Sequence, residues 1–307
     1  MQIRGLVHLL IVYIVWGSTY LGIRVAVRDG AGFPPFVMAG TRILVAGSIL
    51  LLWAALAREK LRPTRGDLIV FASSGLLLWL GGNGLVSWAE KRAESGYAAL
   101  LVGSAPLWTT VVESVVDRRV PTLRLVVALL IGLAGVGVLN YPVMRHGSSA
   151  DILSAVALLV AVMSWGIGSV FQKRRPVTLS GEANAAYQLL FGSVALLTVS
   201  FLVGEPKPTP TPAAIAAWGY LVIFGSVVAF TSFVKALKLL PVSVVMTYAY
   251  VNPVIAVLLG WAILGEQITL WTLAGSVLVI LGVMGVFHEL RRARNVRRAA
   301  AAANEST

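Results

Sequence analysis

Ten long apolar runs, separated by short charged or Pro/Gly-rich breaks, take up most of the sequence. A helix that crosses a bilayer needs about 20 mostly apolar residues. In lipid, only helices and closed barrels satisfy every backbone hydrogen bond. The runs predict transmembrane helices over 5–27, 35–57, 68–88, 96–116, 123–141, 152–172, 183–203, 213–235, 243–264 and 270–288. The expected fold is an all-α integral membrane protein with ten transmembrane helices.

Several classes of function are excluded by what the sequence lacks. It contains no GxxxxGK[ST] phosphate loop, so ATP-driven transport within this chain is excluded. The three histidines, His8, His146 and His288, form no HExxH motif, so we expect no enzyme, no metal and no other cofactor. The net charge of +12 does not indicate a nucleic-acid partner, because lysine and arginine gather in the cytoplasmic loops of membrane proteins.

The basic residues are divided unevenly between the two sides of the expected helices. With a cytoplasmic N-terminus, 18 of the 25 lysines and arginines face the cytoplasm and 6 face the opposite side, while Arg42 lies within a span. Such an asymmetry over short loops favours both termini in the cytoplasm. We expect a multi-pass membrane protein.

The second part of the chain repeats features of the first. Trp16 recurs as Trp165, each followed by glycine, and an offset of 147 residues pairs Pro106 with Pro253. Because each repeat holds five expected helices, an odd number, the second enters the membrane from the opposite side and the repeats are inverted. The expected domains are 1–145 (helices 1–5), 146–290 (helices 6–10) and a basic cytoplasmic tail, 291–307.

Arg42 lies about seven residues into the second expected helix. A charge at such a depth costs roughly 2.5 to 3.5 kcal/mol unless it is paired or hydrated. Two explanations stay open: Arg42 holds a substrate carboxylate, or it pairs with Glu90 or Glu94 at the same membrane face. Glu90 is therefore a candidate gating residue.

Trp16 and Trp165 lie near the middle of their expected helices, whereas membrane tryptophans favour the interface. Either one alone could be a core residue whose ring N–H binds a carbonyl, but a repeat-related pair favours a cavity wall. Aromatic walls with few polar anchors suit a small organic solute better than an inorganic ion. The residues expected to bind substrate are Trp16, Tyr20, Arg42, Trp79, Asn83, Trp165, Tyr187, Tyr248, Tyr250 and Asn252.

Pro106 and Pro253 lie halfway along the fourth and ninth expected helices. Each removes a backbone donor and frees the carbonyl four residues earlier. The freed carbonyls must face protein, water or substrate. A packing kink stays open for either proline alone, but two at matching depths favour a gating role.

Several stretches resemble the EamA family of ten-helix carriers, within the drug/metabolite transporter superfamily. They are WGSTYLGIR from Trp16, PPFVMAGTR from Pro34, GNGLVSWAE from Gly82, SGYAALLVGSAPLW from Ser95, SWGIGSVFQ from Ser164, GYLVIFGS from Gly219 and TYAYVNPVIAVLLGWAILGE from Thr247. The resemblance implies inverted five-helix repeats, a central cavity, a location in a bacterial inner (plasma) membrane and export of metabolites, often amino acids. The chain departs from the family at Arg118 and Arg119, where a Gly-Glu pair is common.

The expected function is that of a secondary carrier that exports amino acids or related small metabolites by alternating access. Its expected partners are a small-molecule substrate and the lipid bilayer, and it is expected to be a monomer or homodimer. A passive channel and a non-transporting membrane scaffold stay open as alternatives.

Overall fold

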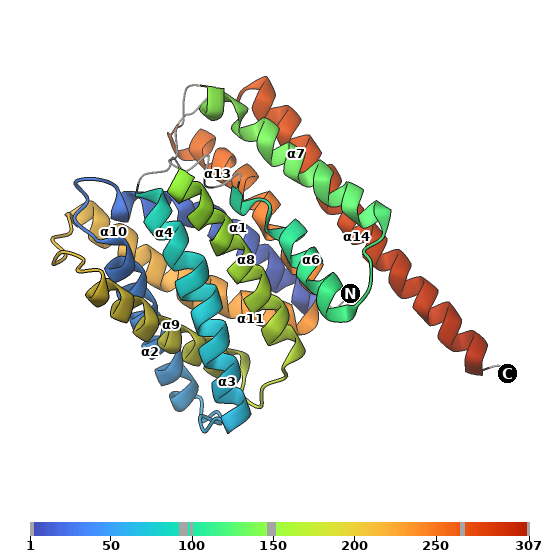
Figure 1. The fold of residues 1–307 in the computed structure, drawn as a ribbon, viewed down its shortest axis with the longest axis horizontal. Helices are drawn as coiled ribbons and strands as arrows, with labels where there is room; N and C mark the ends of the chain where they lie inside the picture. The colour runs from blue at the N-terminus through green and yellow to red at the C-terminus, as the bar shows by residue number, and fades with distance from the viewer. Residues whose placement is uncertain (1–2, 92–97, 99–100, 146–151, 265–267, 306–307) are drawn as a thin grey trace.

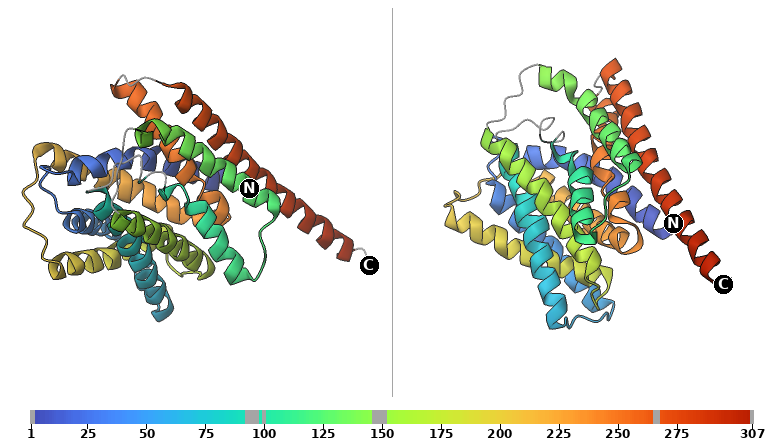
Figure 2. Two further views of the ribbon diagram at one scale, coloured as in Figure 1. Left: turned by 45° about the horizontal axis from the view of Figure 1, so that its top comes forward. Right: turned by 45° about the vertical axis from the view of Figure 1, so that its right-hand side comes forward.

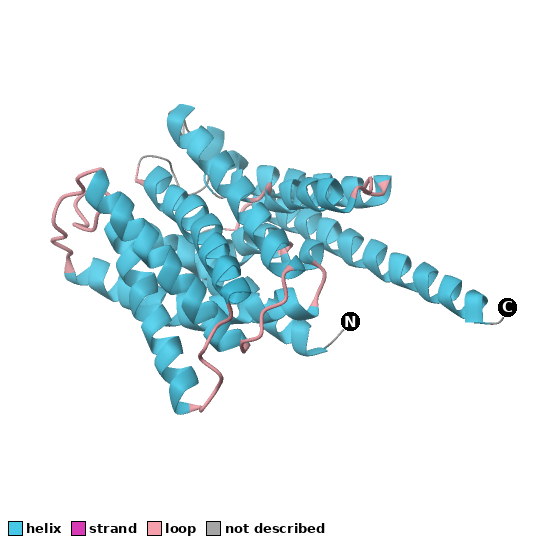
Figure 3. Cartoon of the chain, turned by 60° about the horizontal axis from the view of Figure 1, so that its bottom comes forward, coloured by secondary structure: helices cyan, strands magenta, loops and turns pink. Residues whose placement is uncertain are grey.

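The computed structural model describes residues 3–91, 98, 101–145, 152–264 and 268–305, and the regular elements among them are all helices (Figure 3). They are α1 (Ile3–Val27), α2 (Pro35–Leu56), α3 (Arg65–Ser74), η1 (Gly75–Gly84), α4 (Leu85–Glu90), α6 (Ala105–Asp117), α7 (Leu123–Arg145), α8 (Ile152–Arg174), α9 (Gly181–Leu202), α10 (Pro212–Tyr220), η2 (Leu221–Val228), α11 (Ala229–Leu239), α12 (Val242–Val245), α13 (Tyr248–Leu264) and α14 (Leu270–Glu305). The expectation of an all-α membrane protein is confirmed.

Seven continuous helical stretches are long and apolar enough to cross a membrane. They are Ile3–Val27, Pro35–Leu56, Arg65–Glu90, Ile152–Arg174, Gly181–Leu202, Pro212–Leu239 and Leu270–Ala293. The other expected spans contain shorter helices: α6 begins only at Ala105, and the apolar stretches Leu123–Leu139 and Val242–Ile255 are short. The number of ten crossings therefore stays a prediction.

The last helix is longer than the sequence suggests. A span over 270–288 followed by a basic tail is expected, but α14 continues to Glu305 without a break. No glycine or proline follows Gly285, and the alanines and arginines of this stretch are strong helix formers. The C-terminal part of α14 therefore extends past the body of the molecule (Figure 1).

Helices of the first half of the chain (residues 3–141) pack on helices of the second half (residues 152–288), and helices in corresponding places make corresponding contacts. α2 lies along α9, and α7 lies along α14 (Figures 1 and 2). α1 of the first half packs on α11 and α13, and correspondingly α8 of the second half packs on η1 and α6. Each half thus covers the other with equivalent elements.

The pair α7 and α14 is closely packed through glycines. A Cβ atom added to Gly282 would lie 2.5 Å from the backbone nitrogen of Gly132, and one added to Gly135 would lie 2.6 Å from the nitrogen of Val279. Small residues thus allow the two helix backbones to approach closely.

Two long helical stretches contain a segment of wide π-helix. η1 lies between α3 and α4, and η2 lies between α10 and α11. The two segments occupy corresponding positions in the two halves, and π segments inside α-helices are frequent at functional sites. In η1, a Cβ on Gly82 would lie 2.7 Å from Cε3 of Trp165, so glycine is needed for α8 to approach.

Candidate functional site

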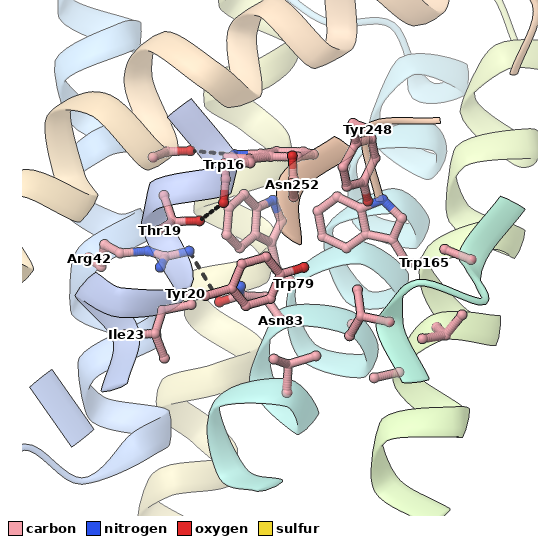
Figure 4. Close-up of a pocket in the computed structure, with 17 residues that line it drawn as sticks. Trp16, Thr19, Tyr20, Ile23, Arg42, Trp79, Asn83, Trp165, Tyr248 and Asn252 are labelled. Atoms are coloured by element: carbon pink, nitrogen blue, oxygen red, sulfur yellow. Dashed lines mark hydrogen bonds between the residues drawn. The ribbon is translucent and has the colours of Figure 1, made fainter. Parts of the chain in front are cut away.

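A cavity of about 80 Å³, room for several water molecules, lies between the two halves (Figure 4). Eight of the ten residues expected to bind substrate contribute to its lining: Trp16, Tyr20, Arg42, Trp79, Asn83, Trp165, Tyr248 and Asn252. These residues come from α1, α2, η1, α8 and α13. The packing of the two halves thus brings together residues that are far apart in the sequence.

Arg42 is buried on α2, with 3% of its surface exposed. Its Nη2 donates a hydrogen bond to Oδ1 of Asn83 over 3.1 Å, and its guanidinium carbon lies 5.4 Å from the ring centroid of Trp79 (Figure 4). Its Nε has no hydrogen-bond partner, and no carboxylate among the described residues forms an ion pair with it. The positive charge therefore faces an amide and an aromatic ring instead of an acid.

The two central tryptophans have different environments. The Nε1 of Trp16 donates to the carbonyl oxygen of Gly225 over 3.0 Å, so this N–H is satisfied as in a core tryptophan, although the ring also lines the cavity. The Nε1 of Trp165 is buried and has no partner. The two rings meet edge to face, with centroids 5.5 Å apart. Trp165 therefore offers a free hydrogen-bond donor in the cavity wall.

α13 is tied to α1 through Asn252. In the amide orientation that satisfies its surroundings, Nδ2 donates to the carbonyl oxygens of Tyr13 (3.2 Å) and Tyr248 (3.0 Å). The side chain of Asn252 also hydrogen-bonds to that of Tyr20. The ring of Tyr248 packs edge to face on Trp16 with centroids 4.8 Å apart. Asn252 and Tyr248 thus hold helices together and line the cavity at the same time.

Tyr187 and Tyr250 do not line the cavity. Tyr187 donates to the carbonyl oxygen of Leu61 over 2.7 Å and stacks on Phe71. Tyr250 donates to the carbonyl oxygen of Leu129 over 2.8 Å and is buried among residues of α7 and α14. Both side chains lie on a helix face that meets other helices and not the cavity.

The two prolines differ in their backbone setting. Pro253 lies inside α13, as expected. Pro106 lies in the first turn of α6, directly after a turn in which the backbone nitrogen of Ser104 donates to the carbonyl oxygen of Leu101 over 3.0 Å. It therefore does not lie inside a continuous helix as Pro253 does, and a proline in the first turn replaces an N–H that has no helical partner. The gating role of the two prolines stays a prediction.

Glu90 is the last residue of α4 and is 1% exposed. Neither carboxylate oxygen has a hydrogen-bond partner, and within the described residues it forms no ion pair with Arg42. The charged group that acts on it is Arg24, on α1. Glu94, the other acid considered as a partner of Arg42, lies outside the described residues.

The rest of the lining is small or apolar. It consists of Thr19, Ile23, Gly82, Val86, Val102, Ala105, Ala161, Val162 and Gly225. Thr19 could have been found from the sequence, because it follows Trp16 by three residues and so shares its helix face. The apolar members give no such signal, since any membrane helix contains many of them.

Comparisons with known proteins agree on a family. The sequence model of the EamA-like transporter family matches residues 3–141 and again residues 152–288. The inner membrane transporter YedA of Escherichia coli K12 is 36% identical over 282 residues, which cover 90% of this chain and 89% of that protein. A protein of Streptantibioticus cattleyicolor named as a probable terminal-alkyne amino-acid exporter is 27% identical, over 90% of this chain and 91% of its own.

The fold also matches a solved crystal structure. The two superpose with a TM-score of 0.77 at 21% sequence identity, over 95% of this chain and 99% of the other. At this identity the likeness concerns the fold alone.

Proposed function

This chain belongs to the EamA-like transporter family, and on that premise we propose that it is a secondary carrier for small organic metabolites in a bacterial inner membrane. Its cargo is an amino acid or a related compound, which it exports by alternating access. The observation that carries this proposal is Arg42, a buried guanidinium that lines the central cavity and has no acidic partner among the described residues.

The cavity offers complementary groups for such a cargo. Arg42 and the amide of Asn83 can bind a carboxylate, since charge-assisted hydrogen bonds to a guanidinium are strong and can be bidentate. The unpartnered ring N–H of Trp165 supplies one more donor, and the rings of Trp16 and Tyr248 supply an apolar wall. The name of the Streptantibioticus cattleyicolor relative supports this choice of cargo.

The architecture that fits this function is ten helices in two inverted repeats, 1–145 and 146–290, with a basic tail at 291–307 and both termini in the cytoplasm. Three observations support it. The family model matches twice, helices in corresponding places of the two halves make corresponding contacts with the other half, and a π segment occupies corresponding positions in each half. Inverted repeats are the usual basis of alternating access, in which one repeat moves against the other around a fixed site. The cavity of about 80 Å³ must widen during that movement to admit most amino acids.

Reconstitution in proteoliposomes tests the function. Vesicles loaded with a mixture of unlabelled amino acids receive isotope-labelled ones outside, and mass spectrometry reads uptake. A carrier gives saturable uptake that is stimulated by solute inside the vesicle. Flux that rises linearly with concentration would identify a passive channel, and no flux over a broad metabolite panel would identify a scaffold.

Two variants tie the flux to the cavity. Arg42→Ala should abolish uptake of carboxylate-bearing solutes, because it removes the only cation among the described residues of the lining. The matched control is Tyr187→Phe, which also removes a polar group from a buried side chain but lies outside the cavity. Equal uptake by both variants would contradict the assignment of the cavity.

A further inference from the structure

Glu90 differs from the other buried acids that the structure describes. Asp67 is equally buried but accepts hydrogen bonds from Thr64 and Thr178, and Glu289 accepts one from Thr122 over 2.7 Å. Glu90 is 1% exposed, and both of its carboxylate oxygens lack a hydrogen-bond partner among the described residues. Such a group needs an explanation, because buried polar atoms in proteins are almost always hydrogen-bonded.

The surroundings of Glu90 contain little that could stabilise a negative charge. Among the residues that the structure describes, the ionisable groups near enough to interact with it are Arg24 and Tyr20, both on α1, and neither hydrogen-bonds to it. From α8, the apolar Ala157 and Leu158 pack beside the neighbouring residue Ala89. Arg42 of α2 is directed to Asn83 of η1 instead, and residues 92–97, 99 and 100 lie outside the described chain.

A carboxylate in this position carries a large desolvation cost without compensating hydrogen bonds, and a buried acid avoids that cost by binding a proton. We propose that Glu90 is a proton-binding site and that release and uptake of its proton are coupled to the movement of the solute. This inference rests on the proposed carrier function and adds the driving ion to it.

Tyr20 links Glu90 to the cavity. It lines the cavity (Figure 4), it interacts electrostatically with Glu90, and its hydroxyl hydrogen-bonds to the side chain of Asn252 on α13. A negative charge on Glu90 would attract Arg24 and draw the hydroxyl hydrogen of Tyr20 towards the carboxylate, so that loss of the proton favours a different arrangement of α1 and α4. Proton release at Glu90 therefore changes the cavity wall where the solute binds.

The position of Glu90 sets the direction of coupling. In the proposed topology α4 ends at the membrane face opposite the cytoplasm, so the carboxyl takes up its proton from outside and releases it to the cytoplasm after the conformational change. One proton moving inward then drives one solute molecule outward. The carrier is an antiporter in which Glu90 is the titrating group.

Infrared difference spectroscopy on the purified protein in lipid nanodiscs tests the protonation directly. At neutral pH the wild-type protein should show the C=O stretch of a protonated buried carboxyl, and Glu90→Gln should lose that component. Glu182→Gln is the matched control, because Glu182 is an acid paired with Lys235 and is expected to be ionised. Identical carboxylic-acid bands in wild type and Glu90→Gln would overturn the proposal.

Transport in proteoliposomes tests the coupling. An acidic lumen should drive uphill uptake of amino acids by the wild type, and Glu90→Gln should reduce this uptake at least about tenfold while keeping solute exchange at equal pH. Glutamine has the shape of the protonated acid, so the variant should unfold at the wild-type temperature. Glu90→Asp, which keeps a titrating group, should restore part of the response to the pH gradient.

The outcomes separate the two proposals. Exchange by the wild type without any response to a pH gradient would overturn the proton site and leave the carrier function intact. Uptake by Glu90→Gln that responds to the pH gradient as strongly as uptake by the wild type would also overturn the proton site and leave the carrier function intact. Absence of exchange in the wild type over the whole solute panel would overturn the carrier function, and the proton coupling with it.

Discussion

Residues 3–141 supply the cavity with Arg42, Asn83 and Trp79, whereas residues 152–288 supply it with Trp165 and Tyr248. Both halves match the same family model, and each carries a π segment in its long central helix. The two halves thus share a sequence family and a helical feature, but they contribute different side chains to the cavity. Both provide aromatic rings and an amide, whereas the charge comes from Arg42 of the first half, and no described lining residue of the second half is charged.

The second and seventh expected helices show this difference most clearly. Arg42 on α2 lines the cavity with its charge unpaired by any described acid. Gln188, near the corresponding position on α9, is neutral, lies outside the cavity and donates to Gln172 (3.0 Å) and Asn184 (2.7 Å). A polar residue inside a span can therefore serve recognition in one half and helix packing in the other.

The largest expected effect on transport comes from replacing Arg42, and replacing Gln188 is the comparison. Arg42→Gln should lower kcat/KM for carboxylate-bearing solutes at least about tenfold, because a hydrogen bond to a charged group contributes roughly 1.5 to 3 kcal/mol. Gln188→Met should leave kcat/KM within about twofold and lower the thermal unfolding temperature instead, because the amide of Asn184 loses its partner. Equal losses of transport in both variants would remove the distinction between the halves.

The next largest effect is expected on stability, when a glycine in each π segment is replaced by alanine. Gly82→Ala places a methyl group 2.7 Å from the ring of Trp165, and such overpacking costs about 1 to 3 kcal/mol of stability. Gly225→Ala meets the methyl group of Thr19 at 3.1 Å and Cδ2 of Leu221 at 3.7 Å, which is less crowded, so we expect a loss below about 1 kcal/mol. Thermal unfolding in detergent measures both. A larger loss for Gly225→Ala would show that η2, and not η1, has the tighter approach.

The two tryptophans provide a smaller and more specific comparison. Trp165→Phe removes a donor that has no protein partner, so KM should rise about three- to tenfold with little change in unfolding temperature. Trp16→Phe breaks the hydrogen bond to Gly225 and should lower stability by about 1 kcal/mol. If Trp165→Phe leaves KM unchanged, its ring N–H does not contact the solute.

The smallest effect on stability is expected from replacing Pro106, the proline of the first half. Pro106→Ala should change stability by less than about 1 kcal/mol, because alanine is accepted in the first turn of a helix. Pro253→Ala supplies a donor inside α13 and should straighten it. The chain has no cysteine, so labelling of Val86→Cys in each background reports access to the cavity. Equal labelling changes would restore the symmetric role that the sequence suggests.

Hydropathy predicts most of the long helices because the requirement for an apolar stretch of fixed length leaves few alternatives. The cost of burying a guanidinium likewise singles out Arg42 from the sequence alone. The neighbour of Arg42 cannot be identified from the sequence in the same way. Asn83 is 41 residues away, and only the packing of α2 against η1 brings the two side chains together. A pairing with Glu90 is expected from charge, but the structure directs Arg42 elsewhere.

Tyr187 and Tyr250 show the limit of predicting a site from depth in the membrane. Tyr250 lies on α13, which contributes to the cavity, and Tyr187 lies on α9, from which no described residue lines it. The face on which a residue lies depends on how neighbouring helices pack. Pro106 shows a second limit. A proline halfway along an apolar run predicts a kink, yet the turn ahead of it makes it the start of a helix.

Competition between an acid and its amide tests the central claim, that Arg42 binds the carboxylate of a transported solute, most directly. Uptake of a labelled amino acid that the wild type transports is measured in proteoliposomes against rising concentrations of the unlabelled acid or its carboxamide, which is nearly the same size. The wild type should be inhibited by the acid at least about tenfold better than by the amide. Arg42→Lys should narrow this ratio, because a point charge replaces a planar fork. Equal inhibition by acid and amide in the wild type, or an unchanged ratio in Arg42→Ala, would contradict the account.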